Sequence, residues 1–135
     1  MLSIDKNSRK PIYEQIVESV EREIASGILK ENDKLPSIRD LSLKLSINPN
    51  TIQKAFIELD RRGIIISYPG RGCFVAPEAS DRLRTSQSDK LQKLSELASQ
   101  LYKLGLSKEE IINAVSKACI ESSTDNRKEN TDDNS

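Results

Sequence analysis

The chain has 135 residues, of which 36% are hydrophobic and 31% charged, and its 21 basic residues balance 21 acidic residues. These values fit one domain or two small units; no apolar run approaches the roughly 20 residues that span a bilayer, and no signal peptide is visible. The chain contains no histidine and its two cysteines lie far apart, so an enzyme is not expected, nor is a metal or another cofactor.

Two amphipathic helices are predicted in the first third of the chain. Apolar residues recur at helical spacing over residues 11–26, and Gly27 follows the last of them. A second, shorter helix is predicted after Ser37, whose hydroxyl can cap it together with Asp40 three residues later. The buried stripe of this second helix is predicted to consist of Ile38, Leu41 and Leu45.

A third helix is predicted to begin at Pro49, after a turn at residues 46–48, because proline suits the first helical position. Its core-facing residues are predicted from their helical spacing to be Ile52, Ala55, Phe56 and Leu59. This spacing leaves short polar side chains and one cation on the exposed face at the front of the helix: Asn50, Thr51, Gln53 and Lys54.

Two helices joined by so short a turn are typical of a helix-turn-helix motif, whose second helix enters the major groove of DNA with its N-terminus first. Short side chains that donate and accept hydrogen bonds suit such a front, because bulky side chains would hold the helix away from the base edges. A plain helical hairpin inside a core has the same pattern and needs no ligand. The two helices alone leave both interpretations open.

A two-stranded wing is predicted directly after the third helix, which Gly63 ends. Two short apolar runs, residues 64–66 and 73–75, flank a turn with Gly70 and Arg71 at its tip. The glycine permits a close approach of the backbone, and the arginine suits a minor groove or a phosphate. The wing favours a DNA-binding winged helix over the plain hairpin.

Charge is distributed unevenly along the balanced chain. Residues 12–33 contain six acidic and two basic residues, whereas residues 34–76 contain three acidic and seven basic residues. A polarised distribution of this kind is what a face docked on phosphate requires, and many solvated faces share it. Charge alone therefore leaves the partner open.

Three strings resemble the GntR family of bacterial transcription regulators: "PIYEQI" (11–16), "KLPSIRDLSLKLSINPNTIQKAFIELDRRGII" (34–65) and "GRGCFV" (70–75). The resemblance covers about residues 9–76, and the short C-terminal part is similar to that of the YtrA-type subfamily. It implies a mainly α fold with a small β wing, a winged helix-turn-helix followed by a two-helix dimerisation hairpin. It also implies a bacterial regulator that binds a double-stranded DNA operator as a homodimer, and the absence of a visible signal peptide or bilayer-spanning run predicts a cytoplasmic location.

The resemblance assigns DNA contacts to particular positions of this sequence. Arg39 matches the family arginine that contacts DNA from the second helix. Asn50 and Thr51 match the polar pair at the front of the recognition helix. Gly70 matches the wing-tip glycine that follows the minor groove. The candidate DNA-binding residues are then Ser37, Arg39, Asn48, Asn50, Thr51, Gln53, Lys54, Gly70 and Arg71.

The sequence departs from the family pattern at the front of the recognition helix. Many members carry arginine where this chain has Pro49 and Gln53, so a different operator sequence is expected. Structural roles stay open for two of the candidate residues. Arg39 could pair with a neighbouring carboxylate, and Lys54 could be a solvated helix charge.

The C-terminal part is predicted to contain a polar connector over residues 77–86 and a dimerisation segment of two helices over residues 87–121. The second of these helices begins with a capping box at residues 107–110. Two helices of this length bury too little apolar surface alone, so the pair is predicted to pack against its copy in a second subunit. The predicted dimerisation residues are Leu91, Leu94, Leu97, Leu101, Leu104, Ile111, Ile112 and Val115.

Two features of the chain's end complete the predictions. Cys119 is interpreted as a core thiol, with a redox switch as the alternative. Residues 122–135 contain no apolar residue and are predicted to form a disordered tail.

The function that fits these features is a homodimeric, sequence-specific DNA-binding regulator, expected to be a repressor that occupies an inverted-repeat operator. A small-molecule effector is compatible with this function, but no residue identifies one, and no membrane partner is expected. Two alternatives stay open. A winged helix that binds protein would not need the exposed set Asn50, Thr51 and Arg71, and a small enzyme would have to work without histidine.

Overall fold

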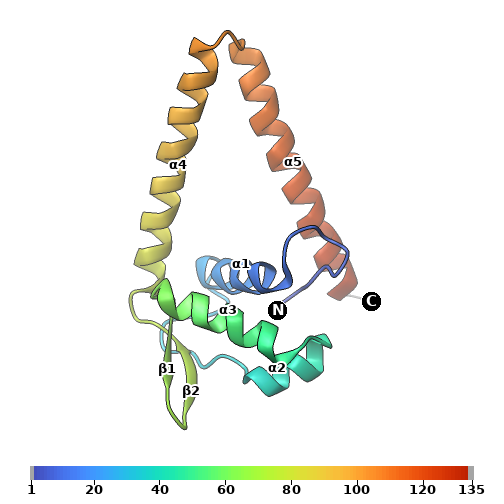
Figure 1. The fold of residues 1–135 in the computed structure, drawn as a ribbon, viewed down its shortest axis with the longest axis vertical. Helices are drawn as coiled ribbons and strands as arrows, with labels where there is room; N and C mark the ends of the chain where they lie inside the picture. The colour runs from blue at the N-terminus through green and yellow to red at the C-terminus, as the bar shows by residue number, and fades with distance from the viewer. Residues whose placement is uncertain (1, 134–135) are drawn as a thin grey trace. The chain divides into compact units, whose positions relative to one another are not determined.

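The computed structural model describes residues 2–133, and from residue 124 onward it describes the backbone alone. The chain forms two compact units, residues 1–87 and residues 88–135. The helices and strands are, in chain order, α1 (Ile12–Ala25), α2 (Ile38–Leu45), α3 (Pro49–Arg61), β1 (Ile65–Tyr68), β2 (Gly72–Val75), α4 (Ala79–Lys103) and α5 (Lys108–Asp133) (Figure 1). This mainly helical architecture with a small hairpin confirms the fold class predicted from the sequence.

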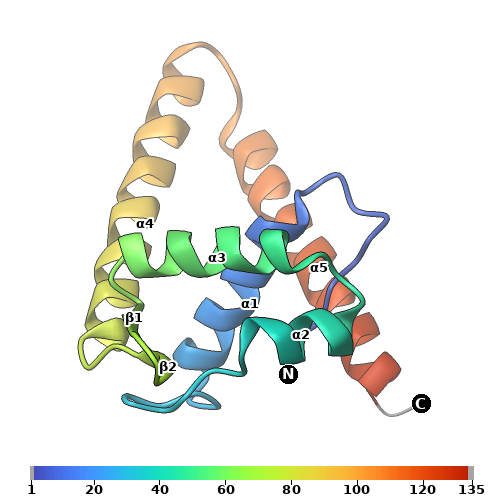
Figure 2. The ribbon, with the colours of Figure 1, turned by 60° about the horizontal axis from the view of Figure 1, so that its bottom comes forward.

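Helices α1, α2 and α3 share one apolar core in the first unit, and α3 packs against both of the others (Figure 2). The residues of α3 that were predicted to face the core are all buried: Ile52, Ala55, Phe56 and Leu59. From α1 the core receives Ile16, Val17, Val20 and Ile24. Because the apolar stripe of α3 is buried on this side, its polar residues must face the other way.

Strands β1 and β2 form an antiparallel hairpin directly after α3. Ile65 pairs with Val75, and both side chains are buried in the core of the first unit. The segment before α2 runs alongside β2, where the N–H of Leu35 donates to the carbonyl oxygen of Cys73 at 2.8 Å. The hairpin is therefore attached at its base, and its turn extends away from the core.

The structure corrects the predicted polar connector, since α4 begins at Ala79, inside residues 77–86. Ala79 and Leu83 lie one helical turn apart, and they are 0% and 6% exposed within the core of the first unit. Leu83 is the one large apolar residue of residues 77–86, which is too few for a helical period to be recognised. The first turns of α4 thus belong to the winged helix.

Residues before α1 also join the first unit, ahead of residue 9 where the family resemblance begins. Leu2 and Ile4 pack against the core. The N–H of Asp5 donates to Gln15 Oε1 at 2.8 Å, and Gln15 Nε2 donates back to the carbonyl oxygen of Asp5 at 3.0 Å. These paired hydrogen bonds hold the N-terminal segment on α1.

In the second unit, a turn at residues 104–107 joins the end of α4 to α5 (Figure 1). The predicted capping box is present there. Ser107 Oγ accepts from the N–H of Glu110, and the Glu110 carboxylate accepts from the N–H of Ser107, both at 3.1 Å. Two N–H groups of the first turn of α5 are thereby satisfied.

The predicted disordered tail differs from the structure, because α5 continues through residue 122 as far as Asp133. Once a helix has been started, each further residue adds one backbone hydrogen bond for one fixed residue. A capped helix can therefore extend through a polar segment that could not start a helix itself. Residues 134 and 135 lie outside the described residues.

Candidate nucleic-acid interface

The turn between α2 and α3 is held by side-chain hydrogen bonds to its own carbonyl groups. Ser46 ends α2 in the left-handed conformation, with φ of 54°. Ser42 Oγ donates to the carbonyl oxygen of Ile47 at 2.6 Å, and Lys6 Nζ donates to that of Ser46 at 3.1 Å. The side chain of Ile47 is 6% exposed and anchors the turn in the core. These contacts hold α3 at a fixed angle to α2.

Both helices of the motif start with a polar cap. At α2, Ser37 Oγ accepts from the N–H of Asp40 at 3.0 Å, as the sequence predicts. At α3, Asn48 Oδ1 accepts from the N–H of Asn50 at 2.9 Å, and Pro49 is the first helical residue. The candidate residues Ser37 and Asn48 are both exposed. Their capping hydrogen bonds also stabilise the starts of α2 and α3.

The front of α3 presents polar groups on the side opposite the core. Asn50, Gln53 and Lys54 are exposed, and Thr51 is half-buried at the edge of the buried stripe. N–H groups in the first turn of a helix have no acceptor within the helix, and they carry the positive end of the helix dipole. In α3, however, the N–H of Asn50 is bound to Asn48 Oδ1 and that of Thr51 to the carbonyl oxygen of Asn48, so the hydrogen-bonding groups free at this front are side chains.

Lys54 lies against an aromatic ring rather than as an isolated charge in solvent. Its Nζ is 4.0 Å from the centroid of the Tyr13 ring at the start of α1. Tyr13 is half-buried, and its hydroxyl donates to Glu14 Oε1 at 3.3 Å. Burial and the Glu14 carboxylate raise the pKa of Tyr13, so its ring stays a neutral phenol near pH 7. Tyr13 therefore holds the Lys54 charge beside the front of α3.

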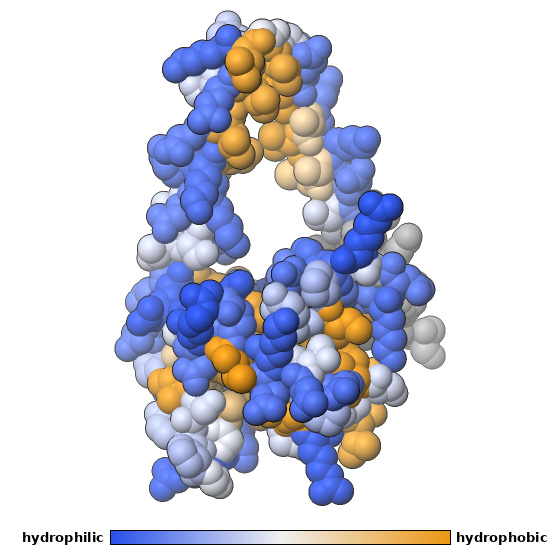
Figure 3. Space-filling view, viewed as in Figure 1, coloured by the Kyte–Doolittle hydropathy of each residue, from blue (hydrophilic) through white to orange (hydrophobic). Residues whose placement is uncertain are grey.

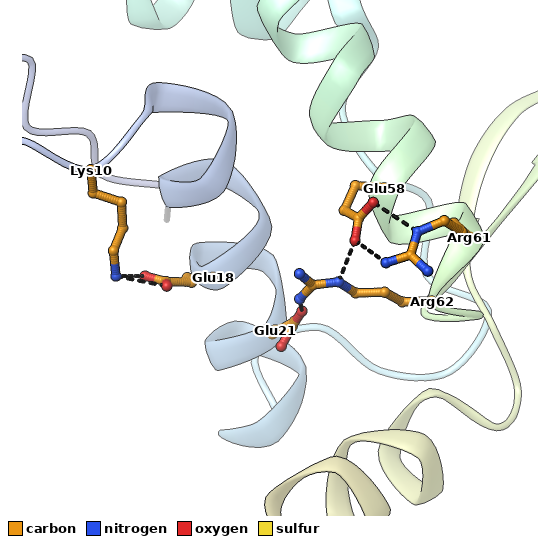
Figure 4. A network of polar contacts seen from close by, with 6 residues as sticks. All are labelled: Lys10, Glu18, Glu21, Glu58, Arg61 and Arg62. Atoms are coloured by element: carbon orange, nitrogen blue, oxygen red, sulfur yellow. Dashed lines mark hydrogen bonds and ion pairs between the residues drawn. The ribbon is translucent and has the colours of Figure 1, made fainter. Parts of the chain in front are cut away.

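A network of ion pairs joins the far end of α3 to α1 (Figure 4). Glu58 accepts from Arg61 Nε and from Arg62 Nε, each at 2.9 Å. Arg62 also donates to Glu21 of α1 at 2.6 Å. Hydrogen bonds from Arg61, and then from Arg62, lower the pKa of Glu58 from 4.5 to about 2. The charges of both arginines are therefore paired with carboxylates.

The wing presents Gly70 and Arg71 at its exposed tip. The N–H of Arg71 donates to the carbonyl oxygen of Tyr68 at 2.9 Å, and Gly70 has φ of 77°, a conformation that glycine adopts without strain. Below the tip, the Tyr68 ring meets Phe74 edge to face, with centroids 5.7 Å apart. These contacts stiffen the hairpin that carries Arg71.

Lys34 adds a second cation to the wing, although the sequence does not single it out. It pairs with Phe74 as an isolated bridge beside β2. Its Cε lies 3.1 Å from the position that a Cβ on Gly72 would occupy. Lys34 and Gly72 are far apart in the sequence, so only the folded register of the hairpin brings the cation to this place.

Comparisons with known proteins agree with this geometry. The profile of the family described as "Bacterial regulatory proteins, gntR family" matches residues 12–75. YhcF of Bacillus subtilis, an uncharacterized HTH-type transcriptional regulator, is 38% identical over 112 residues, which cover 80% of this chain and 89% of that protein. The chain belongs to the gntR family. It is thus a DNA-binding transcription regulator of that family.

This gntR-family chain is also similar to proteins named YtrA. The HTH-type transcriptional repressor YtrA of Bacillus subtilis is 45% identical over 83 residues, which cover 62% of this chain. The chain spans 64% of that repressor, slightly less than two thirds of its length. Among solved structures, YtrA from Sulfolobus acidocaldarius, a GntR-family transcription factor, is 38% identical with a TM-score of 0.54, covering 67% of this chain and 97% of that chain. A transcriptional regulator from Oenococcus oeni is 32% identical with a TM-score of 0.64, covering 88% of this chain and 99% of that chain.

The candidate DNA-binding residues of this family member fall at three places: the start of α2, the front of α3 and the wing tip. Arg39 is exposed, and none of the described residues forms an ion pair with it. Lys54 has a partner, Tyr13, that no sequence period predicts. Tyr13 and Lys34 are thus the residues near the interface that only the folded chain reveals.

Other chemistry has less support in the described part of the chain. A cavity of about 280 Å³ lies in the first unit among Leu2 and residues of α1, α2 and the segment between them. Its lining is mostly apolar, and it includes Lys34 but none of the DNA-binding residues predicted from the sequence. No cluster of His, Cys, Asp and Glu among the described residues could hold a metal ion. No described helix has the length and apolar character needed to cross a membrane.

Cys119 is exposed in the single chain, so its predicted core position would require a second subunit.

Proposed function

We propose that this regulator is a homodimeric repressor that binds an inverted-repeat operator in double-stranded DNA. The observation that carries the proposal is the front of α3, where Asn50 and Gln53 are exposed opposite the buried stripe and Asn48 caps the helix. Repression is inferred from the similarity to the repressor YtrA, of which this chain spans 64%. Since an operator lies on bacterial DNA, the proposed site of action is the cytoplasm.

In the proposed complex, the front of α3 enters the major groove. The amide side chains of Asn50 and Gln53 can each bind adenine through two hydrogen bonds, and the Thr51 hydroxyl can donate or accept. Arginine, which commonly binds guanine, is absent from this front. We therefore expect adenine in the part of each half-site that faces α3.

Cations around this front would bind the phosphates that flank the groove. Lys54 is held beside α3 by Tyr13, Arg39 is exposed at the start of α2, and Arg71 is exposed at the wing tip. Lys34 lies next to Gly72 in the wing. Binding of phosphate by these cations releases counterions, so the affinity for any DNA sequence should fall as the salt concentration rises.

The second unit supports the proposed homodimer. Most of its large apolar side chains are exposed, from 38% at Leu101, Leu106 and Val115 to 80% at Leu104, whereas Ile111 is half-buried. Figure 3 shows apolar surface gathered around the turn between α4 and α5. Patches of this kind mark sites of association, and a second copy would bury them. The proposed contact residues are Leu91, Leu94, Leu97, Leu101, Leu104, Ile111, Ile112 and Val115.

Selection of bound DNA from a random pool, followed by titration of the selected operator, tests the proposal. Asn50→Ala and Thr51→Ala should each weaken operator binding by about 1–3 kcal/mol while barely changing the affinity for random DNA, because they remove base contacts. Lys54→Ala and Arg71→Ala should weaken both and lower the slope of log K against log salt by about 1 per subunit. Lys30→Ala, which removes an exposed cation from the segment between α1 and α2, is the control.

The outcomes separate the parts of the proposal. The selected DNA should contain two inverted half-sites roughly 10 base pairs apart, or a multiple of this spacing, and a single asymmetric site would contradict the symmetric dimer. An unchanged ratio of operator to random affinity in Asn50→Ala and Thr51→Ala would show that α3 is not the reader. Lack of salt-dependent DNA binding would favour a winged helix that binds protein. A small molecule that changes operator affinity would identify an effector.

A further inference from the structure

Ile57 is an apolar residue on the outward side of the helix that we propose to read DNA. Its side chain is 62% exposed. It follows Gln53 by one helical turn and Lys54 by three residues, so it lies on the same face as both. The opposite side of α3 carries the buried residues Ile52, Ala55, Phe56 and Leu59.

Helical geometry places Ile57 close to the middle of this outward side. Asn50 and Ile57 are separated by about two turns, so their side chains leave the helix in nearly the same direction. Side chains on an α-helix lean toward its N-terminus, so Ile57 leans toward Gln53 and Lys54. A single exposed isoleucine is ordinary on a protein surface. Ile57, however, lies among the residues that we propose to read bases, so it is positioned to contact a base in the major groove.

We propose that Ile57 packs against the 5-methyl group of a thymine in each operator half-site and so contributes to sequence specificity. This inference rests on the proposed function, in which α3 lies in the major groove. Four residues of helix advance Ile57 by about 6 Å beyond Gln53. At about 3.4 Å per base pair, this distance corresponds to roughly two base pairs along the groove.

The thymine methyl group is the partner that fits the chemistry of the side chain. It is the apolar group on the major-groove edge of the bases, and apolar side chains recognise thymine by contact with it. A phosphate is not a suitable partner, because the Ile57 side chain has neither a hydrogen-bond donor nor a positive charge. One turn further along α3, the Arg61 guanidinium is already bound to Glu58. Ile57 thus marks the end of the stretch of α3 that is free to read bases.

Replacement of thymine by deoxyuridine, one position at a time, tests the proposal directly, because it removes only the methyl group. For the wild-type chain, one position in each half-site should show a loss of about fourfold in affinity, the value for one buried methylene-sized group. In Ile57→Ala, thymine and deoxyuridine at that position should bind equally. Because the substitution is present in both subunits, the affinity of Ile57→Ala for the unmodified operator should fall by about the square of this factor, as it should for the wild-type chain when both thymines are replaced.

Two further variants control for effects on folding and surface hydrophobicity. Ile57→Val retains a branched side chain and should retain a measurable preference for thymine. Ile28→Ala removes an isoleucine of similar exposure, 64%, from outside α3, and it should leave the preference for thymine unchanged. Thermal melts of all three variants should match that of the wild-type chain, because both side chains are largely in water.

The outcomes distinguish this inference from the proposed function. If Asn50→Ala abolishes the preference for operator over random DNA, but the deoxyuridine effect persists unchanged in Ile57→Ala, Ile57 does not read thymine while α3 is still the reader. A half-site in which no thymine responds to deoxyuridine would overturn the inference in the same way. If Asn50→Ala and Thr51→Ala leave specificity intact, the proposed function itself fails.

Discussion

The guanidinium of Arg62, which follows the last residue of α3, lies 2.6 Å from the carboxylate of Glu21 on α1 (Figure 4). The same guanidinium binds Glu58 on α3, so one side chain joins the two helices. Arg62 and Glu21 are 41% and 17% exposed, which shelters their ion pair only in part. This link restrains α3 at the end opposite its polar front.

Replacement of Arg62 tests how much this link contributes to stability. Arg62→Gln should lower the free energy of unfolding by roughly 0.5–1 kcal/mol, the scale of an accessible ion pair. Arg61→Gln is a matched control, because Arg61 is 70% exposed and pairs with Glu58 on its own helix. Urea denaturation should show a smaller loss for Arg61→Gln. Equal losses would mean that the bond to α1 adds nothing to the pairing within α3.

The same network predicts how stability depends on pH. The pKa of Glu58 is lowered from 4.5 to about 2 by hydrogen bonds from Arg61 and Arg62, so the folded chain binds this proton more weakly than the unfolded chain. The stabilisation is then complete above pH 4.5 and disappears as the pH falls toward 2. Glu58→Gln should reduce the loss of stability across this window in urea titrations. An unchanged acid profile would show that Glu58 is not stabilised as described.

The contact between Lys54 and Tyr13 predicts a role for an aromatic ring that does not itself need to touch DNA. Tyr13→Leu should weaken binding to operator and random DNA by a similar factor of roughly two to five, the equivalent of about 0.5–1 kcal/mol for an exposed cation–π contact. Tyr13→Phe keeps the ring and should bind like the wild type. In a Lys54→Ala background, Tyr13→Leu should have no further effect, and a full additional loss would assign Tyr13 a separate function.

Much of the first unit could be predicted because its sequence pattern is local. The spacing of Ile52, Ala55 and Leu59 determines which side of α3 is buried, and the remaining polar residues then have one face to occupy. The caps at Ser37 and at residues 107–110 are also local, because each hydrogen bond joins two residues that are three apart in the sequence. Such signals do not depend on where the rest of the chain lies.

What the sequence could not show depends on contacts between distant residues. Lys54 of α3 contacts Tyr13 of α1, and Lys34 is brought to the wing by its bridge with Phe74 of β2. The start of α4 was hidden because Leu83 is a single large apolar residue in a polar stretch, and its burial is decided by the core that receives it. These positions follow from packing, which no spacing along one element encodes.

Lys34 gives a test of the wing that is independent of Arg71. Lys34→Ala should weaken operator and random DNA about equally and lower the salt slope by about 0.9 per subunit if this cation binds one phosphate. Lys30→Ala removes an exposed cation four residues earlier in the chain and should leave the slope unchanged. Titrations at several salt concentrations measure both variants. Equal slopes for Lys34→Ala and the wild type would place Lys34 outside the interface.

Truncation at two points of α4 separates its structural part from its proposed dimerisation part. A chain ending at Gln87 retains Ala79 and Leu83, which are 0% and 6% exposed, and should fold as a stable winged helix. A chain ending at Glu78 loses both. Removal of a buried leucine costs about 2–5 kcal/mol, so the shorter chain should unfold at a much lower urea concentration. Similar midpoints for the two chains would show that the first turns of α4 are dispensable for the first unit.

The chain ending at Gln87 also tests the assignment of the second unit. It lacks Leu91 and all the other proposed contact residues, so it should sediment as a monomer at micromolar concentration, whereas the full chain should sediment as a dimer. Its affinity for the operator should fall by roughly 100-fold or more, because the two half-sites lose the high effective concentration that tethering provides. Its affinity for a single half-site should match that of one subunit in the full chain. A truncated chain that still sediments as a dimer would move the dimer contact into the first unit, and the apolar side chains of α4 and α5 would then need a different partner.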